Sequence, residues 1–142
     1  MRLTILSLIS ILIAVPIFLQ AEDDHSSKNI YDSLIQPIFV AKCQECHGST
    51  KSKGKLKLHT KEDFLIGGSG AGKDIVVKGN AEESELIFRI TLPKEDDEAM
   101  PPMEDASHYN PITVEELEVM KGWISLGAKF ELLISDLDDK KQ

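Results

Sequence analysis

The stretch Cys43-Gln44-Glu45-Cys46-His47 places two thiols three residues apart, with a histidine directly after the second. This C-x-x-C-H spacing is the attachment pattern of covalently bound haem. On one helical turn, the two thiols reach the two vinyl groups along one edge of a haem, and the adjacent imidazole reaches the iron. The second ring nitrogen of such a histidine is usually held by a carbonyl or a carboxylate. We therefore predict one haem c bonded to Cys43 and Cys46, with His47 ligating its iron.

Other uses of a cysteine pair explain the sequence less well. A disulfide or a thioredoxin-like redox pair would not need His47, and the redox pair is expected in a βαβ setting that this sequence lacks. A structural zinc site needs four ligands, and His59 and His108 lie too far apart for the usual His-x3–5-His half-site. Haem attachment accounts for the spacing and the histidine together.

The N-terminus is typical of an export signal. Arg2 supplies the positive start, residues 3–19 are mostly apolar, and Pro16 breaks the stretch near its end. We predict a signal peptide over residues 1–21, cut after Ala21. An uncleaved membrane anchor is the alternative, because about 20 apolar residues span a bilayer. Either way, the protein is predicted to be periplasmic or otherwise extracytoplasmic, where bacteria attach c-type haem.

Length and charge limit the organisation and the partners. A chain of 142 residues has room for one domain. We expect a flexible lead over residues 22–29, a folded domain over 30–130 and a charged C-terminal tail over 131–142. The formal net charge of −8 argues against a nucleic acid partner, because phosphate binding needs a dominant basic face. Contact with a membrane is expected only if the N-terminal segment stays uncleaved.

The pattern of apolar residues predicts an all-α domain. The first helix is indicated by apolar or boundary residues at helical spacing, namely Ile30, Leu34, Ile35, Ile38, Phe39 and Lys42. Pro37 requires that this helix either begins near Asp32 or Ser33 or bends at the proline. Leu56 and Leu58 then indicate a short extended piece.

Three further helices are indicated by pairs of capping residues. Thr60 with Asp63 marks a short helix that ends at a glycine-rich loop, and Asn80 with Glu83 resembles the start of another. Thr113 with Glu116 is a clear capping box for a helix that ends at Gly127. The core stripe of this last helix is formed by Leu117, Met120, Trp123 and Ile124.

A second axial ligand is expected among the methionines, because a soft thioether suits haem iron and raises its reduction potential. Met120 falls on the apolar stripe, so we assign it to the core. Met100 precedes Pro101 and Pro102, which stiffen a non-helical segment suited to presenting a side chain. Met100 is therefore the preferred ligand, Met103 is the alternative, and His108 and His59 are remoter candidates.

Two charged runs and one glycine-rich loop complete the motifs. Lysines cluster over residues 51–61, and acidic residues surround the methionines over 95–98 and 104–105. Each run is either a solvated face or a surface that steers a redox partner. The loop Gly67-Gly68-Ser69-Gly70-Ala71-Gly72-Lys73-Asp74 nearly matches a phosphate-binding loop, but Asp74 replaces the hydroxyl residue that would hold Mg²⁺. We interpret it as structural.

The order of several short motifs resembles the planctomycete-type cytochrome c domain over about residues 30–130. The motifs are Ile38-Phe39, Cys43 to Gly48, Leu56-Lys57-Leu58, Gly67-Gly68, Ser84-Glu85-Leu86-Ile87, Met100-Pro101-Pro102 and Trp123 to Ala128. The resemblance implies a class I cytochrome c architecture, with helices around one haem and the first and last helices crossing. It also implies that Cys43 and Cys46 form the thioethers, that His47 is the proximal ligand, and that the Met-Pro-Pro element carries Met100. One departure is that no proline occurs between His47 and Pro93 to orient the histidine, so we expect a backbone carbonyl near Leu56 or Leu58 instead.

The predicted function is that of a mono-haem, one-electron carrier rather than an enzyme, exchanging electrons with redox proteins. Two alternatives stay open. One is a haem enzyme or gas-binding sensor with an open sixth site, and the other is a haem subunit of a larger oxidoreductase complex.

Overall fold

The structure is a computed structural model that describes residues 28–69, 75–103 and 110–137. Within these ranges it is a small helical domain without strands, as the sequence predicts. The first helical segment consists of η2 (Tyr31–Ile35) and α1 (Gln36–Lys42). It is followed by η3 (Lys53–Lys55), α2 (Lys61–Ile66), α3 (Glu85–Thr91), α4 (Val114–Ser125) and η6 (Ile134–Leu137).

The first helix changes its hydrogen-bond register in front of Pro37. η2 is a π-helix in which the N–H of Gln36 donates to the carbonyl of Tyr31, and α1 then carries Pro37 in its first turn. Because proline has no N–H and crowds the preceding turn, the wider π turn lets the helix continue without a break. The helix begins at Tyr31, one residue before the predicted start near Asp32 or Ser33. The wider turn also changes which residues face inward, and Leu34 is 40% exposed.

The structure contains two of the three predicted helix caps. Thr60 Oγ1 accepts from the N–H of Asp63 at 3.1 Å, and both bonds of the Thr113–Glu116 capping box are present. Asn80 accepts from the N–H of Glu83 at 3.3 Å, but α3 begins only at Glu85. The prediction that Asn80 caps this helix is therefore wrong, because the bond closes a turn that precedes it.

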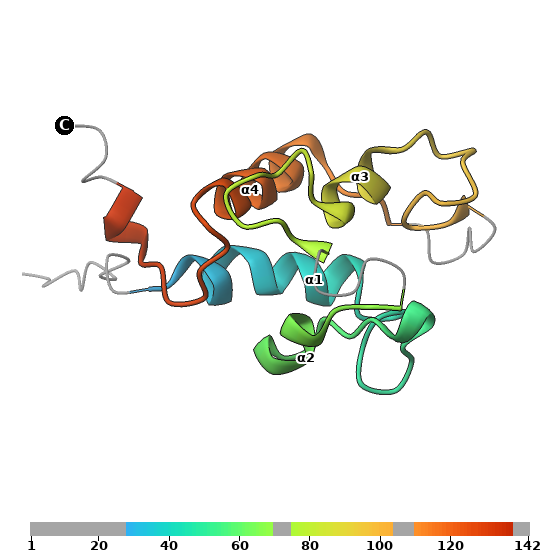
Figure 1. The fold of residues 1–142 in the computed structure, drawn as a ribbon, viewed down its shortest axis with the longest axis horizontal. Helices are drawn as coiled ribbons and strands as arrows, with labels where there is room; N and C mark the ends of the chain where they lie inside the picture. Colours follow the sequence, from blue (N-terminus) through green and yellow to red (C-terminus); the bar gives the residue numbers. More distant parts are fainter. Residues whose placement is uncertain (1–27, 70–74, 104–109, 138–142) are drawn as a thin grey trace, which may run out of the picture.

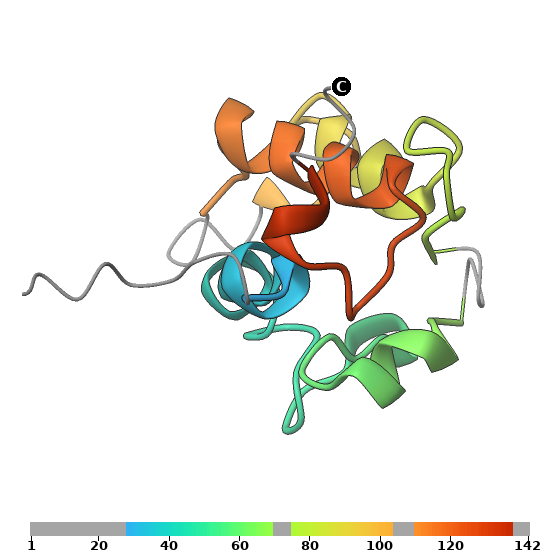
Figure 2. The same cartoon turned by 90° about the vertical axis from the view of Figure 1, so that its left-hand side faces the viewer.

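Helix α4 crosses the first helix and packs its buried side against it. In Figure 1, α3 and α4 lie on one side of α1 and α2 lies on the other. In Figure 2, α1 is seen end-on while α4 runs across the view, so the first and last long helices cross steeply, as the resemblance implied. An aromatic cluster fills the space between them, consisting of Tyr31, Phe39, Phe64, Trp123 and Phe130. Met120 is fully buried, which confirms its assignment to the core.

The chain ends of the described part pack on each other. The N–H of Ile30 donates to Leu132 O at 2.8 Å, and the N–H of Ile134 donates to Lys28 O at 3.0 Å. Contacts thus continue past residue 130. The predicted signal peptide and most of the predicted flexible lead lie outside the described residues. Within the described part, none of the helices combines the length and apolar character needed to cross a membrane.

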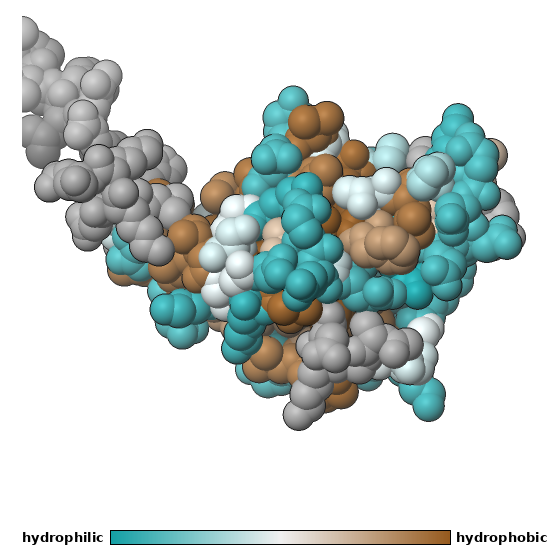
Figure 3. All heavy atoms as spheres, turned by 45° about the horizontal axis from the view of Figure 1, so that its top comes forward, coloured by the Kyte–Doolittle hydropathy of each residue, from teal (hydrophilic) through white to brown (hydrophobic). Residues whose placement is uncertain are grey.

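The surface over α3 and α4 is uneven in polarity. Figure 3 shows hydrophilic side chains at one end of the molecule, over the loop that follows α3. Residues 95–98 of that loop are all exposed. Apolar side chains also reach the surface, among them Phe88 at 47% exposure and Val114 at 72%.

Candidate functional site

A cavity of about 290 Å³ lies beside the Cys43–His47 turn. Its walls include Cys43, His47, Leu56, Leu58, Ile90 and Met100. Three predicted site residues, Cys43, His47 and Met100, therefore meet at one cavity although Cys43 and Met100 are 57 positions apart in the sequence. Cofactor sites are typically mostly apolar hollows of about 300–1,000 Å³ with a few polar groups, which matches this lining.

The Cys43–His47 turn continues directly from α1. The N–H of Cys43 donates to Phe39 O at 2.9 Å, and the N–H of His47 donates to Cys43 O at 2.9 Å. This is the single helical turn that the spacing predicts. Gly48 follows the turn, and a Cβ at this position would collide with the carbonyl oxygen of Gln44. The absence of a side chain at residue 48 is therefore a condition for the local shape.

His47 is oriented by the segment that follows it. Its Nδ1 lies 3.0 Å from Lys53 O, and the N–H of Leu58 donates to His47 O at 2.8 Å. The expectation of a backbone carbonyl is confirmed, but the carbonyl is that of Lys53, three residues before the predicted position near Leu56 or Leu58, because η3 turns the chain back toward the histidine. Burial lowers the pKa of His47, and it outweighs the hydrogen bonds with the backbone of Lys53 and Leu56, which raise this pKa. The lowered pKa favours the neutral imidazole that can ligate a metal.

The two thiols differ in their surroundings. Burial is the main reason why the pKa of Cys43 is raised to about 12, while the negative charge of Glu116 adds to the rise and Lys42 opposes it. The thiol of Cys43 is therefore neutral at physiological pH. Both cysteines are free, and Cys46 lies one turn further along, with its N–H donating to Cys43 O at 3.1 Å.

Met100 and Met103 occupy different environments. Met100 lines the cavity and its N–H donates to Arg89 O at 3.0 Å, whereas the Met103 side chain is 48% exposed. The Met100–Pro101 peptide bond is cis. The segment is also held by the Arg89 side chain, which donates from Nη1 to Glu98 O at 3.3 Å and from Nε to Glu85 Oε1 at 2.6 Å. This position favours Met100 over Met103 as a ligand, and its ligation stays a prediction.

Of the remoter histidine candidates, only His59 belongs to the part of the chain that the structure describes. His59 is not among the residues lining the cavity, and its Nε2 lies 3.2 Å from Asp63 Oδ2. His108 lies outside the described residues. Reasoning from the sequence assigned no role to Arg89 and marked Lys42 only as a helix boundary, because their partners come from other parts of the chain.

The donor set fits haem c. One helical turn carries the two thiols, of which that of Cys43 lines the cavity, a neutral imidazole faces the same cavity, and a thioether lies in another part of its wall. Imidazole and thioether are the axial pair of electron-transferring cytochromes.

The region that contains this cavity is similar to a known protein family. Residues 43–104 match a family described as planctomycete cytochrome C. This part of the chain is a cytochrome c family domain. The matched range begins at Cys43 and includes Met100, so every residue that lines the cavity falls within it. No curated protein and no solved structure matches the chain significantly.

A cytochrome c family domain of this kind implies a haem-based electron carrier. Such cytochromes are generally extracytoplasmic, and two cysteines at the C-x-x-C spacing suggest that the haem is covalently attached.

Proposed function

We propose that the protein is an exported, mono-haem c-type cytochrome that carries one electron at a time between redox proteins. Haem c would be bonded to Cys43 and Cys46, with His47 and Met100 as axial ligands. The observation that supports this proposal is the meeting of Cys43, His47 and Met100 at one cavity within the cytochrome domain.

The residues of the chain would each have a distinct task. When bound, the haem supplies an iron that gains or loses one electron without making or breaking a bond to a substrate. His47 presents a neutral nitrogen because burial lowers its pKa, and Lys53 O fixes the ring orientation. Leu56, Leu58 and Ile90 give the cavity apolar walls that limit water. A thioether from Met100 favours the reduced form and so raises the reduction potential.

The experiment that tests the function is spectroscopy of the purified holoprotein and two methionine variants. A ferric cytochrome with a methionine ligand is low-spin and has a weak far-red sulfur-to-iron band. We expect this band in the natural protein and in Met103→Ala, and its loss in Met100→Ala. Met103→Ala is the matched control because its side chain is exposed and only three positions away.

Four results would contradict parts of the proposal in separable ways. A high-spin natural protein that binds carbon monoxide readily would indicate an open sixth site, as in a haem enzyme or gas-binding sensor. Loss of the band only in Met103→Ala would exchange the ligand but keep the carrier function. Haem that is extracted by acidified acetone would exclude covalent attachment. Copurification of a tagged protein with a larger oxidoreductase would instead indicate a subunit of that complex.

A further inference from the structure

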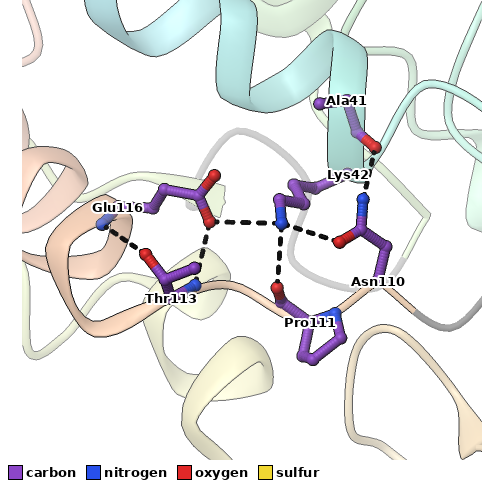
Figure 4. A network of polar contacts seen from close by, with 6 residues as sticks. All are labelled: Ala41, Lys42, Asn110, Pro111, Thr113 and Glu116. Carbon is purple, nitrogen blue, oxygen red and sulfur yellow. Dashed lines mark hydrogen bonds and ion pairs between the residues drawn. The ribbon is translucent and has the colours of Figure 1, made fainter.

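We propose that Lys42 is a positioning residue that keeps Met100 in place against the haem cavity. This inference rests on the proposed His47 and Met100 ligation. It concerns a polar network formed by Ala41, Lys42, Asn110, Pro111, Thr113 and Glu116, which we call the Lys42 network (Figure 4).

The Lys42 ammonium is surrounded by oxygen atoms from a distant part of the chain. Its Nζ lies 2.7 Å from Asn110 Oδ1, 3.1 Å from Pro111 O and 3.4 Å from Glu116 Oε2. Three oxygens match the three protons of an ammonium group. The side chain is only 12% exposed, so these contacts are shielded from water more than an ordinary surface pair would be.

The oxygen atoms around Lys42 are themselves fixed. Asn110 Nδ2 donates back to Ala41 O at 3.2 Å, at the end of α1. Glu116 Oε2 also accepts from the N–H of Thr113 at 2.8 Å, within the capping box that starts α4. Figure 4 shows Lys42 between these two groups, so the network joins the C-terminal end of α1 to the segment that leads into α4. The Lys42 network thus fixes residues 110–113 next to Cys43.

The held segment and Met100 line the same small cavity. A second, smaller cavity of about 40 Å³ is lined by Lys42, Cys43, His47, Met100, Pro101 and Ile112. Ile112 follows Pro111, whose carbonyl Lys42 binds, so the ammonium fixes the wall that faces Met100 and Pro101. On its other side, Met100 is held by the backbone of Arg89. Without the Lys42 contacts, this wall can move away, and we expect Met100 to give up its position more easily.

The test measures how easily an added ligand displaces the methionine. Imidazole is titrated into the ferric holoprotein, and its affinity is compared between the natural protein and Lys42→Met, which keeps a similar side-chain length but removes the ammonium. We expect an increase of about tenfold, the size of effect that loss of a shielded charge-assisted contact produces. The control is Lys121→Met, which removes the exposed ion pair between Lys121 and Glu82 (2.8 Å) and should leave the affinity unchanged within about twofold.

A second background separates positioning from general loosening. In Met100→Ala there is no methionine to displace, so adding Lys42→Met should not change the imidazole affinity. A tenfold rise that persists in this background would overturn the proposal, because Lys42 would then act on something other than Met100. The same holds if Lys42→Met and Lys121→Met behave alike in the natural background.

Two further readouts keep the test decisive. If Lys42→Met yields no holoprotein, Asn110→Ala takes its place, because it removes one oxygen of the network away from the attachment turn. A rise of at least about threefold in this variant supports the proposal, and a smaller change overturns it. The far-red band of the natural protein is recorded first. Absence of the band would refute the methionine ligation of the proposed function. If the band is present and the variants bind imidazole as the natural protein does, only the role of Lys42 is refuted.

Discussion

Tyr31 is a fully buried phenol in the centre of the aromatic cluster. Its pKa is raised to about 12, mainly by burial and to a smaller extent by the negative charges of Asp32 and Glu62. Its hydroxyl has no hydrogen-bond partner within the part of the chain that the structure describes. A buried hydroxyl without a partner costs stability, so Tyr31 is held there by its ring rather than by its oxygen.

This environment predicts a specific loss of stability in alkali. The pKa of Tyr31 is about 12 in the folded protein, against an ordinary value of 10.0 for the unfolded chain, so its contribution is fully present below pH 10. It is lost as the pH rises through 12, by about 3 kcal/mol in total. Urea unfolding from pH 8 to 12 should show this loss in the natural protein and not in Tyr31→Phe. Parallel curves for the two proteins would contradict the prediction.

At the scale of single residues, the sequence predicts those site residues whose roles depend on adjacent residues in the chain. The C-x-x-C-H motif predicts the thiols and the histidine, and the cavity contains Cys43 and His47. The choice between Met100 and Met103 depends on which side chain turns inward. The prolines after Met100 already favour it, but the direction of the side chains is seen only in the fold, where Met100 lines the cavity and Met103 is 48% exposed.

At the scale of elements, the turn from Cys43 to Gly48 carries the strictest demand on shape. A Cβ at residue 48 would collide with the Gln44 carbonyl, which lies between the two cysteines. We expect Gly48→Ala to shift this carbonyl, to destabilise the turn by about 1–3 kcal/mol and to lower the yield of covalent haem. The ratio of haem to protein, measured by the pyridine haemochrome spectrum, tests this.

Gly122 is the matched contrast within α4. A Cβ there meets no atom within 4 Å, and the residue lies inside the helix. Gly122→Ala should therefore stabilise the protein by about 0.5–1 kcal/mol, because alanine loses less backbone freedom than glycine in a helix. Thermal unfolding measures it, with the haem content expected to stay unchanged. A destabilised Gly122→Ala would show that this position does not have the open space that the prediction needs.

Capping residues predicted helix starts well where their partners are local, as for Thr60 and for the Thr113–Glu116 box. The prediction from Asn80 was wrong because its bond with the N–H of Glu83 can close a turn as well as start a helix. The π-helical register of residues 31–35 left no sequence signal besides Pro37, since either a bend or a later start would also accommodate a proline.

At the scale of the whole molecule, the charges near the cavity are separated. Lys53 lines the cavity and its neighbours in the sequence, Lys51 and Lys55, are exposed, whereas residues 95–98 form an exposed acidic segment before Met100. The net charge of −8 would by itself repel an anionic oxidant. Local charge can dominate at short range, because the Debye length is only about 8–10 Å near physiological salt.

We therefore expect the two charged segments to act in opposite directions. Hexacyanoferrate(III) should oxidise the triple variant Lys51→Gln, Lys53→Gln and Lys55→Gln at least about twofold more slowly than the natural protein. The matched variant Glu95→Gln, Asp96→Asn and Asp97→Asn should react faster. Stopped-flow rates at low and high salt test this, and both differences should vanish at about 1 M salt. Equal rates at low salt would mean that both runs are only solvated surfaces.

Contacts between distant segments could not be predicted from the sequence. The Lys42 network joins residues about 70 positions apart, and nothing in the local pattern around Lys42 identifies Asn110 or Glu116 as its partners. The helical class and the crossing of the first and last long helices were predictable, because the family resemblance covers the arrangement as a whole.

Trp123 has a practical consequence for studies of this protein. It is the only tryptophan of the chain, it is 1% exposed, and its Nε1–H donates to Lys129 O at 3.0 Å. Its fluorescence therefore comes from a single place in the core. A porphyrin held in the cavity of so small a domain would quench that emission by energy transfer, so the light returns only when the chain opens or the pigment is missing. The protein thus contains its own optical probe of pigment loading and unfolding, with no label needed.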